Sequence, residues 1–254
     1  MSDEASHANR FAGASVLVTG GSRGIGREIA LTFAEQGASQ VAIGYLRSDG
    51  AAKKTAAELR ERGAEPVLLR GNVGDTARLE AMLDELGELD VVVANAATGV
   101  MRPALKLTEK HWDWTMDANA RSLFTLARVT APRLSPGSSI VALSSLGSTR
   151  VLENYVLVGV SKAAIEALVR YLAVELASND VRVNAVTAGL VDTDALEHFP
   201  DRQAMLDFYR QRTPAGRLVM AADIAGVVSF LASPEAAMIR GQSIIVDGGY
   251  SLIA

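Results

Sequence analysis

The sequence predicts a single α/β domain in which helices cover both faces of a doubly wound parallel sheet of about seven strands. Two observations lead to this fold. Short β-branched runs alternate with segments of helical periodicity along nearly all of the 254 residues, as in a parallel sheet with crossover helices. A glycine-rich turn also joins the first of these runs to the first helical segment, and no repeat or linker interrupts the alternation.

The composition excludes several classes of protein. A formal net charge of -4 gives no support for nucleic-acid binding, and the lack of cysteine excludes disulfides and a cysteine nucleophile. The three histidines, His7, His111 and His198, have no metal-ligand spacing, so we expect no metal. No apolar run reaches the roughly 18 residues of a membrane span, and the polar N-terminus lacks a signal core. We therefore expect a disordered tail over residues 1–13, one domain over residues 14–254 and a cytoplasmic location.

The first predicted strand, residues 15–19, runs directly into Gly20-Gly21-Ser22-Arg23-Gly24-Ile25-Gly26. A helical segment over residues 27–36 follows and stops at Gly37, a typical residue at a helix C-terminus. Glycines let a backbone approach a pyrophosphate, and the helix N-terminus offers free N–H groups and a partial positive charge. We expect this turn to bind the phosphates of a dinucleotide, the alternative being an ordinary tight turn.

The end of the second strand, residues 40–45, indicates which dinucleotide binds. NAD-binding units usually place an acid there, bonded to the ribose 2′-hydroxyl. This chain has Gly44-Tyr45-Leu46-Arg47 and no acid before Asp49. Arg47, together with Arg23, could instead hold a 2′-phosphate, since a guanidinium group binds phosphate through paired hydrogen bonds. We expect NADPH, unless these arginines are solvated surface residues.

Strands and helices keep alternating through the middle of the chain. We expect helices over residues 50–62, from Asp75 to about Leu86, and from the N-cap Thr108 onward, and strands over residues 66–70, 89–94 and 139–143. Asn119 would open or interrupt a helical stretch that runs toward Leu134 and is broken by Pro136-Gly137.

The segment from Tyr155 to Leu176 is expected to be a long helix that carries the chemistry. Tyr155 and Lys162 stand seven residues apart, which at about 100° per residue is within ~20° of two full turns. If the helix covers both, a phenol and an ammonium share one face, as a general acid assisted by a positive charge requires. The alternative is a half-buried tyrosine beside a lysine whose amine reaches solvent.

The last third of the chain completes the sheet. We expect strands over residues 181–186 and 242–246 and a helix over residues 221–232. Between them, residues 192–217 have the weakest pattern and contain helix-breaking prolines. We therefore expect a mobile helix-loop lid over the substrate site.

With these motifs in view, the sequence resembles the short-chain dehydrogenase/reductase family over essentially its whole length. The matching motifs are Thr19 to Gly26, Asn72-Val73, Asn95-Ala96-Ala97, Asn119, Ser144-Ser145, Lys162-Ala163-Ala164, Arg182 to Val186 and Val246 to Gly249. The resemblance implies a Rossmann-type fold, a homodimer or homotetramer, and Asn119 in an active-site helix. It also implies cofactor contacts by Gly20, Ser22, Arg23, Gly24, Ile25, Gly26, Arg47, Asn72, Val73, Asn95 (on the adenosine side), Ala96, Lys162, Gly189 and Thr193 (near the nicotinamide amide or the phosphates).

One departure from the family pattern bears on the reaction. Most members carry their tyrosine four residues before the lysine, where this chain has Val158. The spacing Tyr-x6-Lys instead resembles the enoyl-acyl-carrier-protein reductases, above all the NADPH-dependent type III subgroup of bacteria. That likeness extends to residues 111–116, 143–148, 152–155, 192–196 and 213–217. Val151 stands where the subgroup has an aromatic residue, and Ala188 replaces a proline common in the family, so a specialised pathway stays open.

The resemblance implies NADPH-dependent reduction of a 2-enoyl thioester on acyl carrier protein or coenzyme A, in fatty-acid, acyl or polyketide biosynthesis. Hydride adds to C3 of such a substrate while charge develops on the C1 oxygen, so the acid must stand further from the nicotinamide. Placing the tyrosine seven instead of four residues before the lysine moves it roughly 4.5 Å along a helix.

Tyr155 would bond the enolate oxygen, and Lys162 would hold the nicotinamide ribose and lower the phenol pKa. Ser145, Val151 and Val158 would lie at the substrate site. Two alternatives stay open: a carbonyl reductase of the same family, acting on 3-ketoacyl or other ketone substrates, and a non-catalytic cofactor-binding module.

Overall fold

The computed structural model describes residues 9–192 and 202–253, and these contain one parallel sheet of seven strands. The strands are β1 (Ser15–Thr19), β2 (Gln40–Tyr45), β3 (Glu65–Arg70), β4 (Leu89–Ala94), β5 (Leu134–Ser145), β6 (Arg182–Ala188) and β7 (Ser243–Val246). Their order is β3-β2-β1-β4-β5-β6-β7, so the winding direction changes between β1 and β4. The predicted doubly wound sheet is confirmed, and a change of this kind opens a crevice at the carboxyl ends of the strands.

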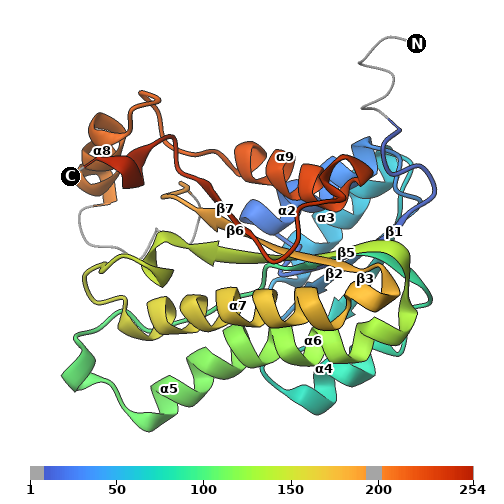
Figure 1. Cartoon of the computed structure of the whole chain (residues 1–254), viewed down its shortest axis with the longest axis horizontal. Helices are drawn as coiled ribbons and strands as arrows, with labels where there is room; N and C mark the ends of the chain where they lie inside the picture. Colours follow the sequence, from blue (N-terminus) through green and yellow to red (C-terminus); the bar gives the residue numbers. More distant parts are fainter. Residues whose placement is uncertain (1–8, 193–201, 254) are drawn as a thin grey trace.

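Helices cover both faces of the sheet (Figure 1). One face carries α2 (Gly24–Glu35), α3 (Asp49–Glu61) and α9 (Ala221–Ala232), and the other carries α4 (Thr76–Leu83), α6 (Ser122–Thr130) and α7 (Val156–Glu175). Further helices are α5 (Glu109–Met116) and α8 (Arg202–Arg212). None of the helices in the described parts of the chain combines the length and the apolarity needed to span a membrane.

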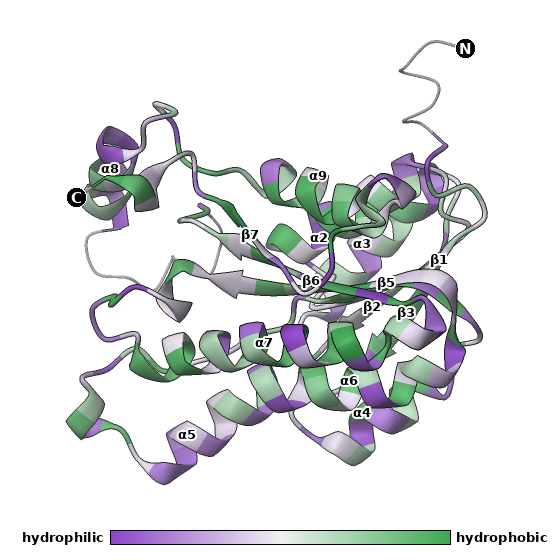
Figure 2. Ribbon diagram, viewed as in Figure 1, coloured by the Kyte–Doolittle hydropathy of each residue, from purple (hydrophilic) through white to green (hydrophobic). Residues whose placement is uncertain are grey.

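The core forms because neighbouring residues of each strand face opposite sides. Val16 and Val18 of β1 belong to one buried cluster and Leu17 to the other, and all three are almost wholly inaccessible to solvent. Strands buried on both faces appear in sequence as continuous apolar runs. The helices carry hydrophobic and hydrophilic residues together, as expected where one side packs on the sheet and the other meets solvent (Figure 2).

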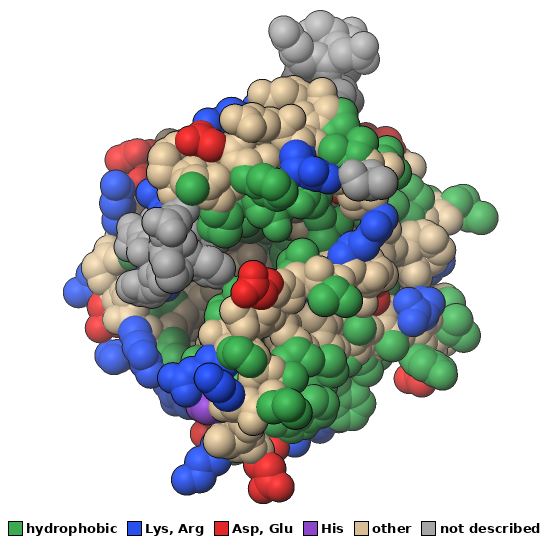
Figure 3. Space-filling view, turned by 90° about the vertical axis from the view of Figure 1, so that its left-hand side faces the viewer, with side chains coloured by type: hydrophobic (Ala, Val, Ile, Leu, Met, Phe, Trp, Pro, Cys, Tyr) green, Lys and Arg blue, Asp and Glu red, His purple; other side chains and the backbone are tan. Residues whose placement is uncertain are grey.

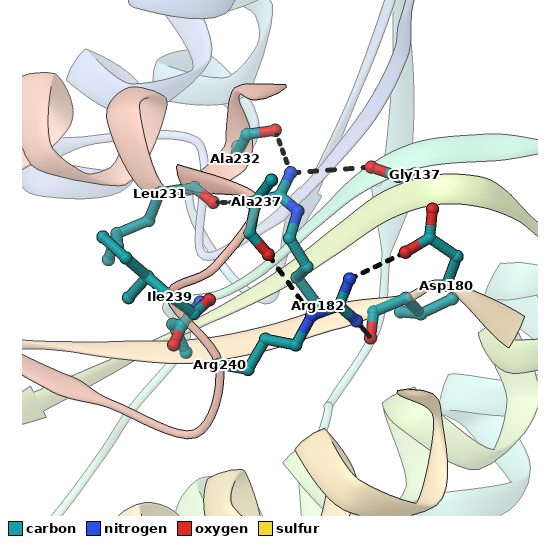
Figure 4. A network of polar contacts seen from close by, with 10 residues as sticks. Gly137, Asp180, Arg182, Leu231, Ala232, Ala237, Ile239 and Arg240 are labelled. Atoms are coloured by element: carbon teal, nitrogen blue, oxygen red, sulfur yellow. Dashed lines mark hydrogen bonds and ion pairs between the residues drawn. The ribbon is translucent and has the colours of Figure 1, made fainter. Parts of the chain in front are cut away.

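A buried arginine fastens the end of α9 to the sheet (Figure 4). Arg182, the first residue of β6, is 3% exposed and donates hydrogen bonds to the carbonyl oxygens of Leu231 and Ala232, the latter at 2.8 Å. Next along the strand, Asn184 donates to the Ile239 carbonyl and accepts from the Gln242 amide. The 182–186 motif therefore satisfies backbone groups that the end of α9 and the entry to β7 would leave unpaired.

The packed chain begins earlier than predicted. Phe11 is buried, its ring meets that of Phe33 edge to face with centroids 4.8 Å apart, and its amide bonds the Gln36 carbonyl. Residues 9–13 thus belong to the fold and not to a tail, because the buried Phe11 ring and the backbone bond to Gln36 attach this segment to the end of α2. Residues 1–8 lie outside the described part of the chain.

Two boundaries in the middle of the chain also differ. The helix expected to reach Leu86 ends at Leu83, and β5 begins at Leu134, where a continuing helix was expected. Leu134 pairs with Leu89, and the register then shifts between Leu89 and Val91. Pro136 and Gly137, the latter at φ +89°, fall in that irregular part of the strand, where a residue without an amide proton and one with positive φ are accommodated.

Candidate active site

A cleft of about 620 Å³ lies at the carboxyl ends of β1, β2, β4, β5 and β6. Figure 3 views the molecule from the left-hand side of Figure 1 and shows a hollow in this face. Most of the predicted site residues line the cleft: Gly20, Ser22, Arg23, Gly24, Ile25, Gly26, Arg47, Asn72, Val73, Asn95, Ala96, Ser145, Tyr155, Lys162 and Gly189. The structure therefore brings the glycine turn and the Tyr155–Lys162 pair into one cavity.

The glycine turn is packed too tightly for side chains. Gly20 adopts φ +68°, and a Cβ on Gly26 would lie 2.2 Å from the Gly20 carbonyl oxygen. Asn95 fixes the turn by donating from Nδ2 to the carbonyl oxygens of Thr19 (3.0 Å) and Gly20 (3.1 Å). Arg23, the N-cap of α2, makes no side-chain cap, so the amides of the first turn of α2 stay available. Bare backbone and free amides fit a pyrophosphate.

Two arginines line the cleft beside this turn. The side chains of Arg23 and Arg47 are exposed, and no hydrogen bond or ion pair occupies either of them within the described residues. The nearest acid in sequence, Asp49, lies 3.4 Å from the Arg70 guanidinium and does not line the cleft. The end of β2 thus presents positive charge and no carboxylate, as recognition of a 2′-phosphate requires.

Tyr155 stands at the start of α7 and not inside it. It is the N-cap residue, after Asn154 in the left-handed region at φ +58°. Its phenol oxygen lies 3.3 Å from the Ser145 hydroxyl. The expectation that a helix covers both Tyr155 and Lys162 is therefore wrong at its first residue, because the turn at Asn154 sets the direction of the tyrosine.

Two glycines let the tyrosine ring lie where it does. A Cβ on Gly147, in η4 (Leu146–Ser148), would lie 2.5 Å from Cε1 of Tyr155, and a Cβ on Gly159 would lie 2.6 Å from the Gly147 carbonyl oxygen. Any side chain at either position would separate η4 from the first turn of α7. The close approach of these segments holds the phenol against Ser145.

Lys162 is buried below the tyrosine and is 6% exposed. Its Nζ donates to the Leu143 carbonyl oxygen at 2.7 Å. Burial lowers the pKa of Lys162 to about 8, and the Glu166 carboxylate opposes that shift. Burial raises the pKa of Tyr155, which the Ser145 hydroxyl partly offsets. The lowering of the phenol pKa by Lys162 that we expected is therefore absent from this arrangement.

Asn119 was expected either to open or to interrupt the helical stretch, and in the structure it interrupts it. It lies in a π-helical turn, η2 (Asp117–Arg121), and is 2% exposed. Its side chain bonds both backbone groups of Thr98 and donates to the Ser161 hydroxyl at 2.8 Å. Asn119 thus ties the loop after β4 to α7 one residue before Lys162.

Two predicted residues do not line the cleft. Val151 is fully exposed. Val158 is 8% exposed and packs so closely against Gly99 that a Cβ on Gly99 would lie 2.1 Å from Cγ2 of Val158. Neither lines the cleft, so their assignment to the substrate site is not met in this structure. Thr193 and the first part of the expected lid lie outside the described residues.

The described part of the expected lid is the helix α8 and the loop after it. Tyr209 of α8 stacks on Tyr250 with ring centroids 4.7 Å apart, so α8 is held by η8 (Tyr250–Leu252) near the C-terminus. Burial, with contributions from Tyr250 and Tyr155, raises the pKa of Tyr209 to about 12.

Sequence reasoning missed two side chains around Lys162. Ser161 joins Asn119 to α7, and Glu166 binds the ends of two strands. The four-residue spacing of Lys162 and Glu166 was the available signal, since such pairs share a helix face. No group of three or more His, Cys, Asp or Glu side chains in the described residues could hold a metal ion.

Comparisons with known proteins agree with this geometry. The family model described as enoyl-(acyl carrier protein) reductase matches residues 20–251. A 1-cyclohexenylcarbonyl-CoA reductase of Streptomyces collinus is 39% identical over 94% of this chain and 87% of its own length. A 3-oxoacyl-[acyl-carrier-protein] reductase of Staphylococcus aureus is 35% identical over 92% of this chain and 97% of its own. A short-chain dehydrogenase of Burkholderia cenocepacia, solved in complex with NADP, superimposes with a TM-score of 0.89 at 32% identity, over 96% of this chain and 100% of that one.

Proposed function

We propose that this chain, which belongs to the short-chain dehydrogenase/reductase family, catalyses the NADPH-dependent reduction of the carbon–carbon double bond of a 2-enoyl thioester. The thioester would be carried on acyl carrier protein or coenzyme A. A saturated acyl thioester is the product, which suits fatty-acid biosynthesis or a specialised acyl or polyketide pathway.

The cofactor assignment rests on the fit of the cleft to a phosphorylated dinucleotide. The turn around Gly20 and Gly26 would hold the pyrophosphate on bare backbone and on the amides of α2. Arg23 and Arg47, both unpaired within the described residues, would hold the 2′-phosphate. Lys162 and Tyr155 line the same cleft, where the nicotinamide ribose would lie. When bound, reduced nicotinamide supplies the hydride.

The protein's own residues stabilise the carbonyl oxygen of the thioester. As hydride adds to C3, the electron pair of the double bond moves toward the C1 carbonyl and negative charge develops on its oxygen. The Tyr155 hydroxyl donates a hydrogen bond to that oxygen and gives its proton to it, and a proton from solvent restores the tyrosine. The resulting enol then takes a proton from solvent at C2 and loses the proton on its oxygen, which gives the saturated thioester. The buried ammonium of Lys162 favours this charge, since opposite charges attract more strongly in a low dielectric.

One observation carries the choice of an enoyl over a keto substrate. The position four residues before Lys162 is filled by Val158, which packs against Gly99 and offers no hydroxyl to the cleft. A ketone at the hydride-accepting carbon needs its proton donor there, whereas a conjugated thioester presents its oxygen two carbons away. The name of the Streptomyces relative, which is 39% identical, denotes an unsaturated acyl-CoA substrate and supports the same choice.

A carbonyl reductase is the second candidate, and one contact favours it. The Tyr155 phenol lies 3.3 Å from Ser145, so a serine and a tyrosine could together hold a ketone oxygen. The Staphylococcus relative, at 35% identity, carries the name of a 3-oxoacyl reductase. A non-catalytic module is the third candidate, but the burial of Lys162 beside the cleft disfavours it.

The test is an assay with matched substrates. A crotonyl and an acetoacetyl thioester on the same pantetheine carrier are incubated with the protein and NADPH, and the loss of NADPH absorbance is followed. We expect turnover of the enoyl substrate and negligible turnover of the keto substrate. Faster turnover of the keto substrate would overturn this assignment, and NADPH binding without turnover of either would indicate a non-catalytic module.

We also propose that the chain forms a homodimer or homotetramer. Phe124 on α6 and Tyr171 and Val174 on α7 are 50%, 72% and 78% exposed. Large side chains exposed together on neighbouring helices are typical of surfaces that another chain covers. Light scattering coupled to gel filtration measures the mass in solution, and a monomer at micromolar concentration would contradict the proposal.

A further inference from the structure

A single carboxylate below the cleft joins one helix to three strands. One oxygen of Glu166, on α7, accepts hydrogen bonds from the Ser144 hydroxyl at 2.6 Å and from the Thr187 hydroxyl at 3.0 Å. Ser144 lies near the end of β5 and Thr187 near the end of β6. The Thr187 oxygen is in turn 2.6 Å from the Ser243 hydroxyl, at the start of β7. Glu166 is thus fixed beneath the residues that line the cleft.

Lys162 lies one helical turn before this carboxylate. Residues four apart on a helix are neighbours on its surface, and Lys162 bonds Leu143, the residue next to the one that Glu166 binds. The ammonium is 6% exposed and has one hydrogen-bond acceptor among the described residues. Burying a charge costs free energy unless an opposite charge compensates it.

We propose that Glu166 is a positioning residue that keeps Lys162 charged and in place for cofactor binding. The inference rests on the proposed binding of NADPH at Lys162, and it assigns a task to a side chain that does not itself line the cleft. Glu166 acts on the ammonium through charge, and its bonds to Ser144 and Thr187 hold that charge at a constant place relative to the strands.

Other groups around Lys162 do not share this task. Tyr155 is neutral at pH 7, because burial raises its pKa. On η2, which packs on α7, Asp117 and Arg121 pair with each other at 3.0 Å. Asn119 and the hydroxyls from β5 and β6 carry no charge. Among the described residues, the Glu166 carboxylate opposes the effect of burial, which lowers the pKa of Lys162 to about 8.

The chain offers a direct way to observe this lysine. It contains five lysines, and the other four (Lys53, Lys54, Lys106 and Lys110) are exposed. Protein labelled with ¹³C at the lysine ε-carbon is titrated by NMR from pH 6 to 11 without cofactor, with Lys162→Met to identify the signal. In the wild type we expect one lysine signal to titrate near pH 8, and this signal should be absent from Lys162→Met.

The variant Glu166→Gln should move that midpoint to lower pH, since it keeps the size of the side chain and removes its charge. Glu175→Gln is the matched control, because it removes a carboxylate from an exposed position of the same helix, away from Lys162. We expect Glu175→Gln to keep the midpoint of the wild type. Should Glu166→Gln not fold, Glu166→Asp, whose carboxylate is one methylene further away, should move the midpoint in the same direction by less.

A second measurement follows NADPH binding by fluorescence between pH 6 and 8.5, without a thioester. Glu166→Gln should lower the affinity for NADPH by less than about twofold at pH 6 and by about tenfold at pH 8.5, because the Lys162 ammonium then loses its proton at a lower pH. An unchanged Lys162 midpoint, or an equal loss of affinity at every pH, would overturn the proposal and leave Glu166 a purely structural tie. If the midpoint moves but the wild type does not bind NADPH, the proposed function fails and the action of Glu166 on Lys162 stands.

Discussion

The phenol oxygen of Tyr155 lies 3.3 Å from the hydroxyl of Ser145, the last residue of β5. This contact joins the N-terminus of α7 to the end of a central strand. It also points the one acidic proton of the tyrosine into the cleft, next to a second hydroxyl that can receive a hydrogen bond from it. The two residues therefore form the polar end of the proposed substrate site.

Tyr155→Phe should lower turnover of the enoyl thioester by about 10²–10³, as expected when one donor to a developing oxyanion is removed. The affinity for NADPH should stay nearly unchanged, because the ring remains. Stopped-flow measurement of the chemical step checks this, with Tyr171→Phe, on the same helix but outside the cleft, as the control. Wild-type turnover in Tyr155→Phe would show that Tyr155 only packs.

Gly147→Ala tests whether the position of the ring matters. The new Cβ would lie 2.5 Å from Cε1 of Tyr155, so the ring must move away from Ser145. Misplacing a catalytic group by about 1 Å can cost ~10²-fold in rate, and we expect a loss of that order with NADPH binding retained. Gly87→Ala, which meets nothing within 4 Å, should be silent. Equal activity of both variants would contradict this account of the site.

The sequence allowed the sheet to be predicted because buried parallel strands are continuous apolar runs, which local composition reveals. It also allowed the glycine turn, Arg47, Tyr155 and Lys162 to be placed in one site, since motif spacing is local information. The N-terminal boundary of α7 was harder to predict. Tyr155 lies outside the helix because Asn154 adopts a left-handed conformation, and that conformation is stabilised by contacts with other parts of the chain, such as the bond from the Arg102 amide to the Asn154 carbonyl.

The side chains that sequence reasoning misplaced depend on contacts between distant segments. Val158 turns to Gly99, about sixty residues earlier in the chain, and Val151 follows a turn that leaves it in solvent. Glu166 binds Ser144 and Thr187 across two strands. Such pairings require the strand order and register, which no single segment contains.

Arg47→Ala should lower the affinity for NADPH by about 10- to 100-fold, since a hydrogen bond to a charged group contributes roughly 1.5–3 kcal/mol. NADH should be little affected, because it has no 2′-phosphate. Titration of both cofactors by protein fluorescence checks this. Arg70→Ala is the matched control, since Arg70 pairs with Asp49 and does not line the cleft. Equal losses for NADPH and NADH would show that Arg47 does not read the 2′-phosphate.

The buried ammonium of Lys162 should make the free protein more stable as the pH rises. Burial lowers the pKa of Lys162 to about 8 from 10.5, so between these values the unfolded chain binds more protons than the folded chain. Stability must therefore increase with pH in that window, by about 2 kcal/mol between pH 7 and 9.5. Urea unfolding at pH 7, 8, 9 and 9.5 measures this. Lys162→Met should remove the increase, whereas Lys106→Met, at an exposed position, should keep it. A flat profile in the wild type would show that Lys162 is already solvated in the folded protein, and with it the electrostatic role assigned to this lysine would fall.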